Sequence, residues 1–401
     1  MESALVVRRD RGLRIAQAKR IKTVGTVWIV PSESHAGSYV VAPSDQLITC
    51  TCPDFELRRA PCKHVFAVEF VRHRITADGT PVTETLKVTY GQDWPRYNAA
   101  QCAEKDFVQV LLRDLCDGIV TPAHPGRGPK PIPLADSTYA SVMKVYTGMS
   151  GRRATSDIRA CHSAGHIHRA PSYNSVFAYL ARPEITPLLT ALVEDSAAPL
   201  ASVESQFAAD ATGFSSSVYK RWYDAKYGKE MKESTWVKAH AMIGTSTNVI
   251  TSIKVTDGNT NDSPQLPALL DGTARHFTMR EVSADKGYLS HANLAAIEAA
   301  HAVPYIPFKI NSQGEGSAAW QRMWGLFMYK RPEFQTHYHR RSNVESTFSM
   351  VKRKFGGNVR SKVFVAQQNE VLCKALCHNL AVLVHAMHEL GIEPTFNGAG
   401  K

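Results

Sequence analysis

The chain has 401 residues, of which 44% are apolar and 21% charged, and its formal net charge at pH 7 is +11. This length predicts two or three domains with a sizeable core, and the positive charge is compatible with a polyanionic partner. No run of about 18 apolar residues occurs, so neither a transmembrane helix nor a membrane partner is expected. The basic first residues lack the apolar core of a secretory signal, which predicts a reducing cytoplasm, where cysteines bind metals more often than they form disulfides.

Residues 1–80 are predicted to form a small ββα zinc finger. The segments TVGTVWIV and SYVVAP, between residues 23 and 49, are rich in β-branched and aromatic residues, and Pro31–Gly37 supplies the turn of a hairpin. The later segment HVFAVEFVRHRI has the apolar spacing of a helix. Four metal-ligand side chains lie between the hairpin and the start of this helix, in the pattern Cys-x-Cys-x9-Cys-x-His: Cys50, Cys52, Cys62 and His64.

Three thiolates and one imidazole make a closed tetrahedral shell, which is typical of a structural rather than a catalytic zinc site. Because so small a segment has little core of its own, bound Zn²⁺ would supply folding free energy. The alternative is four buried side chains without a metal. From about residue 20 to residue 75 the sequence resembles the SWIM zinc finger, which is named for this ligand pattern. The motif does not indicate whether such a finger binds DNA or protein.

Residues 81–133 are predicted to be a helical segment followed by a linker. Apolar residues recur at helical spacing from residue 107 to residue 119, and Cys102 and Cys116 are assigned to the packing of this helical region. The segment TPAHPGRGPKPIP, residues 121–133, is dense in proline and glycine. This composition favours an extended linker, so we place a domain boundary here.

Residues 134–203 carry short helical patterns broken by glycines and prolines, and we predict a helical DNA-binding region here. The segment MSGRRATSDIRACHSAG has the size and basic character of a helix-turn-helix unit, with Ser150 as its N-cap. The alternative is a basic connector that packs on the next domain. The candidate phosphate- or base-contacting residues are Arg152, Arg153 and Arg159. A neighbouring group has a spacing that fits no closed metal site well: Cys161, His162, His166 and His168.

Residues 204–392 are predicted to alternate strands and helices in the order β-β-β-α-β-α-β-α, which indicates an α/β domain. The strand in ESQFAADATGF is expected to end near Asp210, with Thr212–Gly213 as a turn, and the strand in FTMREVSADKGYL places Asp285 at its carboxyl end. The strand VPYIPFK is followed by helices that lead to Glu345. This order, with acids at strand ends, is what an RNase H-like fold with a mixed central sheet and flanking helices would show.

The segment YHRRSNVESTFSMVK is predicted to be one helix that gathers four functional side chains on one face. At about 100° per residue, a phenol, a guanidinium, a carboxylate and an ammonium fall within an arc of about 60°. They belong to Tyr338, Arg341, Glu345 and Lys352. A carboxylate between cations suits metal-assisted chemistry on a phosphodiester, and a neighbouring apolar stripe would hold the helix against a core. The alternative is a solvated surface helix with an Arg341–Glu345 pair.

The spacing Tyr-x2-Arg-x3-Glu-x6-Lys is identical to the signature around the last acidic residue in a large group of bacterial insertion-sequence transposases of the DDE type. The motifs DATGF, KAHAMIG, VSADKGY and PYIPFK resemble their counterparts in that group, over residues 205–385 or so. The resemblance implies an RNase H-like catalytic domain whose catalytic residues are Asp210, Asp285 and Glu345, with Asp262 as the nearest rival carboxylate. It also implies a set of DNA-binding residues, namely Tyr338, Arg341, Lys352, Arg353 and Lys354.

Three clustered carboxylates repel one another by roughly 4 kcal/mol per pair at 4 Å and an effective dielectric of 20. Such a cluster persists only around divalent cations, and hard oxygen ligands with open positions select Mg²⁺ or Mn²⁺ over Zn²⁺. Two such ions activate a nucleophile and stabilise the leaving oxygen of an in-line displacement. The predicted cofactors are therefore two Mg²⁺ or Mn²⁺ ions held by the three acids, and a structural Zn²⁺ in the finger.

The resemblance implies a transposase that cuts and joins DNA strands at the ends of an insertion sequence, without a covalent protein–DNA intermediate. Its expected partners are double-stranded transposon ends and target DNA, and a homodimer would hold two ends in a synaptic complex. The expected location is the prokaryotic cytoplasm, in association with the nucleoid. Two alternatives stay open: a catalytically silent DNA-binding protein derived from a transposase, and a nuclease that does not transfer strands.

Two other basic segments are candidates for contact with DNA. KRKFGGNVRSK, residues 352–362, is favoured for contact with the DNA backbone. VYKRWYDAKYGKEMK would line a DNA groove or form a solvated loop, and its basic and aromatic residues include Lys220, Arg221, Trp222 and Lys226. On the closing helix NEVLCKALCHNLAVLVHAMHEL, three metal-ligand side chains are assigned to core packing instead: Cys373, Cys377 and His378.

Overall fold

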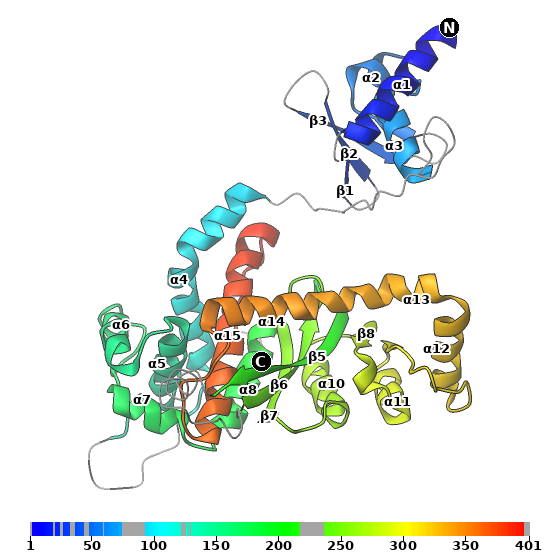
Figure 1. Cartoon of the computed structure of the whole chain (residues 1–401). Helices are drawn as coiled ribbons and strands as arrows, with labels where there is room; N and C mark the ends of the chain where they lie inside the picture. The colour runs from blue at the N-terminus through cyan, green and yellow to red at the C-terminus, as the bar shows by residue number, and fades with distance from the viewer. Residues whose placement is uncertain are drawn as a thin grey trace, which may run out of the picture. The chain divides into compact units, whose positions relative to one another are not determined.

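The computed structural model describes residues 2–18, 21–24, 27–32, 37–43, 48–58, 60–73, 93–121, 126, 128, 130–216 and 236–396. The chain divides into two compact units, which we call the N-terminal unit (Met1–Trp94) and the C-terminal unit (Pro95–Lys401) (Figure 1). The basic segment with Lys220, Arg221, Trp222 and Lys226 lies outside the described residues.

The N-terminal unit contains an antiparallel sheet and helices that pack with it. Its elements are α1 (Glu2–Ala18), β1 (Lys22–Val24), β2 (Val27–Pro31), β3 (Ser38–Pro43), β4 (Ile48–Cys50), α2 (Pro53–Arg58) and α3 (Lys63–His73). The strands lie in the order β1-β2-β3-β4, and the pairing of β2 with β3 confirms the predicted hairpin. Helix α1 packs closely on α3, because a Cβ at Gly12 would lie 2.6 Å from the Cβ of Phe66.

The C-terminal unit begins with helices whose apolar faces belong to its core. They are α4 (Trp94–Asp117), α5 (Leu134–Tyr146), α6 (Gly151–Ser163), α7 (Tyr173–Leu180), α8 (Ile185–Ala197) and the short 3₁₀ helix η1 (Ala198–Leu200). This series confirms the short helices predicted before residue 200. Helix α4 packs with this unit through Val108 and Leu112, so the division of the chain falls at the first residue of α4 and not within residues 121–133. Cys116 is buried, as predicted, whereas Cys102 is exposed.

A five-stranded mixed sheet forms the centre of the C-terminal unit. Its strands are β5 (Gln206–Ser215), β6 (Trp236–Gly244), β7 (Ile250–Asp257), β8 (Glu281–Ala284) and β9 (Val303–Tyr305), in the order β7-β6-β5-β8-β9. Strands β7, β6 and β5 are antiparallel, whereas β8 and β9 run parallel to β5. The connections after β7 and β8 contain the 3₁₀ turn η2 (Ser263–Gln265), α10 (Leu266–Ala274), the 3₁₀ turn η3 (Lys286–Tyr288) and α11 (His291–Ala299).

The prediction that β5 ends near Asp210 is wrong. The strand continues to Ser215 because β6 pairs with it along its whole length, so Thr212–Gly213 is not a turn. Pairing with β8 does stop here, at Ala209↔Ala284. Asp210 therefore lies in the middle of β5, but at the point where its parallel neighbour ends.

After β9 the chain is helical: α12 (Ala318–Tyr329), α13 (Arg331–Tyr338), η4 (His339–Arg341), α14 (Ser342–Phe355) and α15 (Phe364–Leu390). The predicted single helix from Tyr338 to Lys352 is therefore interrupted, because a 3₁₀ turn joins the end of α13 to α14. Figure 1 shows α13 and α14 continuing one another past the strands. The predicted apolar stripe of α14 is buried and includes Val344, Phe348 and Val351.

The turn between β6 and β7 fixes α14 to the sheet. Asn343 of α14 donates from Nδ2 to the carbonyl of Thr245 (2.6 Å), and Thr347 donates to Oδ1 of Asn248 (3.0 Å). Asn248 adopts a left-handed backbone (φ 64°), and its carbonyl accepts a hydrogen bond from His378 of α15 (2.8 Å). The position of the helix that carries Glu345 is thus set by a turn about a hundred residues earlier.

Two buried charges on α15 hold the segment that follows α14. Lys374 donates from Nζ to the carbonyls of Gly356 (2.7 Å) and Asn358 (2.6 Å). One turn earlier, the carboxylate of Glu370 accepts from the backbone N–H groups of Arg360 (3.0 Å) and Ser361 (2.9 Å). The basic segment after α14 is therefore held by charge-assisted hydrogen bonds to the core.

Helix α15 is apolar and long enough to match a membrane span by length and composition, but 78% of its most apolar window is buried inside the protein. Its polar side chains are satisfied there: Asn379 accepts from the N–H of Ile250 (2.9 Å) and donates to the carbonyl of the same residue (2.7 Å). Cys373, Cys377 and His378 are buried, as predicted. We therefore interpret α15 as the core helix of the unit.

Lys374 should give the fold a pH dependence in the alkaline range. Burial lowers its pKa from 10.5 to about 8, so between these values the folded chain binds fewer protons than the unfolded chain. The free energy of unfolding should then rise with pH across this window. Across this window, the free energy of unfolding of the native chain should increase on the order of 3 kcal/mol relative to that of Lys374→Met. Urea unfolding at several pH values measures this difference. The exposed Lys362, replaced by methionine, should show no such window, and a pH-independent difference for Lys374 would contradict the prediction.

Candidate active site and metal centre

Two acids meet where β5 and β8 separate. The register that pairs Ala208 with Ser283 and Ala209 with Ala284 brings Asp210 and Asp285 next to each other as the pairing ends. Burial raises the pKa of Asp210, and the charge of Asp285 raises it further, while hydrogen bonding and Arg341 oppose this. The end of the β5–β8 pairing thus places two carboxylates side by side, although β5 itself continues to Ser215.

Arg341 joins the third acid to this pair. Its Nη1 lies 2.6 Å from Oδ2 of Asp210, and its Nη2 lies 3.0 Å from Oε1 of Glu345. The guanidinium is also 5.9 Å from the ring centroid of Tyr338. The charge of Asp285 acts on both Arg341 and Tyr338. Three of the side chains that the sequence predicts at the site therefore contact one cation: Asp210, Glu345 and Tyr338.

The chemistry of these acids fits a divalent cation, but their arrangement holds a guanidinium. Among the described residues, no three carboxylates bring one oxygen each within 4.8 Å of one another. Asp210 and Glu345 instead each give an oxygen to Arg341. Carboxylate oxygens are the ligands that Mg²⁺ and Mn²⁺ prefer, so Asp210, Asp285 and Glu345 could hold such an ion once Arg341 releases Asp210.

A hollow of about 450 Å³ opens beside these acids, and its wall includes Asp210, Glu345, Lys352 and Arg353. Lys352 donates from Nζ to Oγ1 of Thr212 (2.6 Å), and burial lowers its pKa. Its ammonium is thus held at the wall of the hollow that Asp210 and Glu345 also line. Anionic groups that enter here meet two cations next to the carboxylates.

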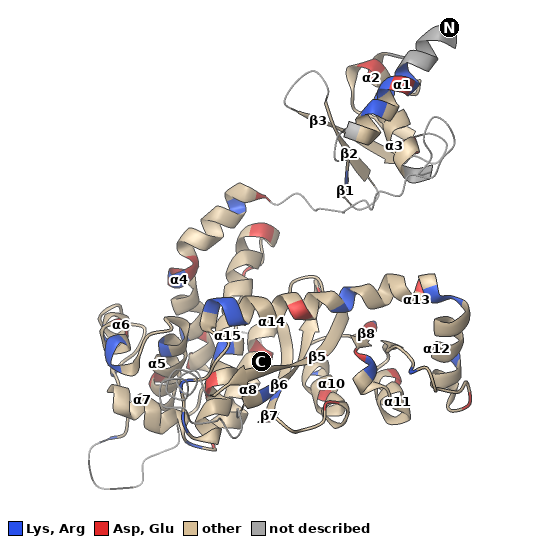
Figure 2. Ribbon diagram, viewed as in Figure 1, with Lys and Arg blue, Asp and Glu red and all other residues tan. Residues whose placement is uncertain are grey.

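Lys354, in contrast, is engaged within the protein. Its ammonium pairs with the buried carboxylate of Glu104 on α4, which also accepts a hydrogen bond from the hydroxyl of Tyr146 (2.5 Å). Figure 2 shows the basic end of α14 and the basic residues of α6, where Arg152, Arg153 and Arg159 are exposed. These three exposed arginines give α6 a basic face.

A second polar cluster lies near the acids and was missed by the sequence analysis. Lys238 and His240 of β6 lie 2.6 and 3.2 Å from Oδ1 of Asp262, and Nε2 of His240 is 2.9 Å from Oγ1 of Thr256. Asp262, the rival carboxylate, is thus paired with a lysine. The buried hydroxyl of Tyr288 has no hydrogen-bond partner among the described residues. The alternation in KAHAMIG, which puts Lys238 and His240 on one face of a strand, is the signal that could have identified this cluster.

The four predicted zinc ligands converge in the N-terminal unit. All four are buried, and one ligand atom from each lies within 4.8 Å of all the others. Nδ1 of His64 is 3.8 Å from Sγ of Cys50 and 3.9 Å from Sγ of Cys62. A tetrahedral ion with ordinary Zn–S and Zn–N bonds would separate these atoms by roughly 3.5 Å, so the cluster fits Zn²⁺ closely. Nε2 of His64 is buried, with no hydrogen-bond partner among the described residues.

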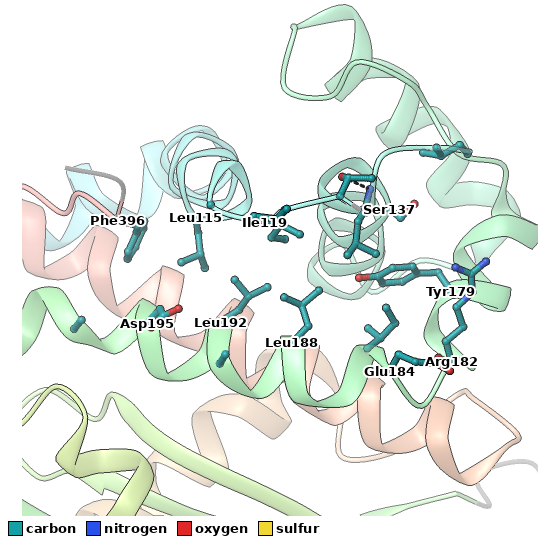
Figure 3. Close-up of a pocket in the computed structure, with 18 of the residues that line it drawn as sticks. Leu115, Ile119, Ser137, Tyr179, Arg182, Glu184, Leu188, Leu192, Asp195 and Phe396 are labelled. Carbon is teal, nitrogen blue, oxygen red and sulfur yellow. Dashed lines mark hydrogen bonds between the residues drawn. The ribbon is translucent and has the colours of Figure 1, made fainter. Parts of the chain in front are cut away.

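A larger cavity of about 960 Å³ lies among the helices (Figure 3). The side chains that point into it are mainly apolar and include Leu115, Ile119, Leu188, Leu192 and Phe396. Its lining shares no residue with the acids or with the hollow beside them. We therefore assign it no part in the chemistry of the carboxylates.

Comparison with known families matches both parts of the chain to a family. Residues 201–380, which include all three acids, match the transposase DDE domain. Residues 39–73, which include all four Cys and His ligands, match the SWIM zinc finger. No curated protein and no solved structure matches the chain. The chain therefore combines a transposase DDE domain with an N-terminal SWIM zinc finger.

Proposed function

We propose that residues 204–392 form an RNase H-like catalytic domain that cleaves DNA strands and transfers them at the ends of an insertion sequence. The observation that carries this proposal is the convergence of Asp210, Asp285 and Glu345 from β5, β8 and α14 around Arg341, beside a hollow with further cations. The strand order, with three antiparallel strands followed by two parallel ones, supports the RNase H-like assignment.

The three acids would hold two Mg²⁺ or Mn²⁺ ions, which supply activation of the nucleophile and stabilisation of the leaving 3′-oxygen. Lys352 and Arg353 line the hollow next to the acids, where they would hold the phosphates on either side of the scissile bond. Arg341 would hold another phosphate, and the ring of Tyr338 would stack on a displaced nucleotide. Lys354, which is paired with Glu104, would reach DNA only by giving up that contact.

Residues 134–203 would contact DNA outside the catalytic domain. Their helices present Arg152, Arg153 and Arg159 to solvent, whereas Ile158 and Cys161 of α6 pack into the core. This division of one helix into a basic face and a buried face supports backbone contact with DNA. Residues 81–133 would connect this region to the zinc finger of residues 1–80, and a homodimer would hold two DNA ends together.

All three acids and their neighbouring cations are present in one place, so no observation favours a catalytically silent descendant of a transposase. The DNA product distinguishes a nuclease that only hydrolyses strands from a transposase that also joins them. Given DNA with a pre-nicked 3′-OH end, a transposase yields a joined strand, whereas a nuclease yields only shorter ones.

Replacement of Glu345 by glutamine should abolish Mg²⁺-dependent cleavage and leave DNA binding intact. The amide keeps the shape of the side chain but removes the charge that holds a cation, so we expect a loss of at least about a hundredfold in the rate of cleavage of DNA carrying the element's ends. Glu333→Gln, the same change at an exposed position of α13, is the matched control. Normal cleavage by Glu345→Gln would remove Glu345 from the site.

Replacement of Cys62 by serine should remove the structural zinc. We expect about one Zn²⁺ per native chain by elemental analysis and a loss of most of it in the variant, because a closed shell of four ligands becomes one of three. The N-terminal unit should then unfold at a lower temperature, since metal binding contributes to its folding free energy. Cys102→Ser, at an exposed thiol, should keep the zinc. A native chain without zinc would refute the assignment.

The double variant Arg153→Gln, Arg159→Gln should weaken DNA binding about equally for all sequences. Each lost phosphate contact should reduce the slope of log affinity against log salt concentration by about 1, so the slope should fall by about 2. Fluorescence anisotropy at several salt concentrations measures this slope. An unchanged slope would favour the alternative, in which this helix is a basic connector.

A further inference from the structure

We propose that Arg341 is the internal counter-ion of Asp210 and Glu345, and that it must leave Asp210 before a divalent cation can bind there. The inference rests on the proposed function and adds a coupling to it. A single movement of Arg341 would then free Asp210 for a metal ion and let Arg341 contact DNA.

Arg341 bridges two of the three acids. Its two terminal nitrogens reach carboxylates from different elements, Asp210 on β5 and Glu345 on α14. The guanidinium is planar, so one rigid fork spans both groups. The side chains of Arg341 and Asp210 are only 18% and 23% exposed, which keeps solvent from weakening this pair. The oxygen of Asp210 that lies 2.6 Å from Arg341 is one that a cation bound to all three acids would use.

The guanidinium of Arg341 and a divalent cation would compete for the same carboxylate because both are positively charged. The guanidinium of Arg341 lies 2.6 Å from Oδ2 of Asp210, so it occupies the oxygen that a divalent cation would need. A divalent cation bound to the same oxygen would face a like charge at short range. One of the two positive groups therefore has to move, and the flexible side chain is the one that can.

The hollow beside the acids offers Arg341 a new position, in which it could bind a DNA phosphate. It opens at Asp210 and Glu345, and Lys352 and Arg353 line it as well, so a DNA phosphate entering it arrives beside Arg341. Guanidinium binds phosphate through paired hydrogen bonds as readily as it binds carboxylate. Phosphate and metal would thus each favour the same position of Arg341. By thermodynamic linkage, each should then strengthen the binding of the other.

The test measures cation affinity in the absence of DNA, on the full-length, zinc-loaded chain. Binding of Mn²⁺ is followed by electron paramagnetic resonance, with Asp210→Asn as the reference that identifies the signal from this site. We expect Arg341→Gln to bind Mn²⁺ about tenfold more tightly than the native chain, because the competitor is gone. Arg340→Gln, the same change one residue earlier in a side chain that pairs with Glu281, should leave the affinity unchanged.

Arg341→Lys provides a second variant that keeps the charge. A single ammonium cannot span both carboxylates as the fork does, so its Mn²⁺ affinity should lie between those of the native chain and Arg341→Gln. Circular dichroism checks that each variant is folded, and Arg341→Lys carries the test if Arg341→Gln does not fold.

The outcomes separate the inference from the function on which it rests. Mn²⁺ affinity in Arg341→Gln equal to or weaker than that of the native chain would overturn the counter-ion role, while an Asp210-dependent site would still support the proposed enzyme. If no chain binds Mn²⁺ in a way that depends on Asp210, the proposed function itself fails. Equal tightening by Arg340→Gln would mean that only the general loss of positive charge matters, and this would also overturn the role of Arg341.

Discussion

Like charges held close together are the constraint around which the C-terminal unit is arranged. Asp210 and Asp285 are neighbours because the parallel pairing of β5 with β8 ends just before them, and the two acids cannot move apart without a change in this register. Their repulsion requires a cation, and in this structure the cation is Arg341, which also brings in Glu345. The site is therefore assembled by electrostatic attraction across three elements, and not by the geometry of one helix face alone.

The helix that supplies Arg341 and Glu345 is positioned by polar contacts with distant parts of the chain. The turn between β6 and β7 accepts hydrogen bonds from Asn343 and Thr347 of α14. The same turn is fixed to the rest of the unit, because Asn248 accepts from His378 and Thr247 donates to Glu204. At the far end of α14, the buried Lys374 fixes the carbonyls of Gly356 and Asn358. Both ends of α14 are thus anchored, which is what a site made of side chains from different elements requires.

The buried polar groups of α15 anchor other segments of the C-terminal unit in the same way. Four side chains of this helix each make hydrogen bonds to backbone groups of other segments: Glu370, Lys374, His378 and Asn379. An apolar helix could fill the same volume, but it would leave those backbone groups without partners. The helix therefore serves both as a core element and as the support that sets the loops around the acids.

The N-terminal unit follows a different principle, because its own chain is too short to build a large core. Cys50 ends β4, while Cys62 and His64 lie at the start of α3, so the ligands join the sheet to the helix. Bound Zn²⁺ would act as a cross-link between these two layers.

The sequence by itself determined what depends on short spacings. The four zinc ligands are within fifteen residues, so their pattern was sufficient to predict the cluster that the structure brings together. The burial of Val344, Phe348 and Val351 followed from helical periodicity, and the position of Asp285 directly after β8 followed from a short run of strand-forming residues.

Tertiary structure alone decided the rest. The pairing of β6 with all of β5 placed Asp210 in mid-strand, and the packing of α4 gave Lys354 a partner in Glu104. The bond of Arg341 to Asp210 spans 131 residues, and the pair of Lys238 and Asp262 links a strand to a later turn. Local periodicity predicts which face a residue occupies, but partners so far apart are chosen by sheet register and helix packing, which no short segment encodes.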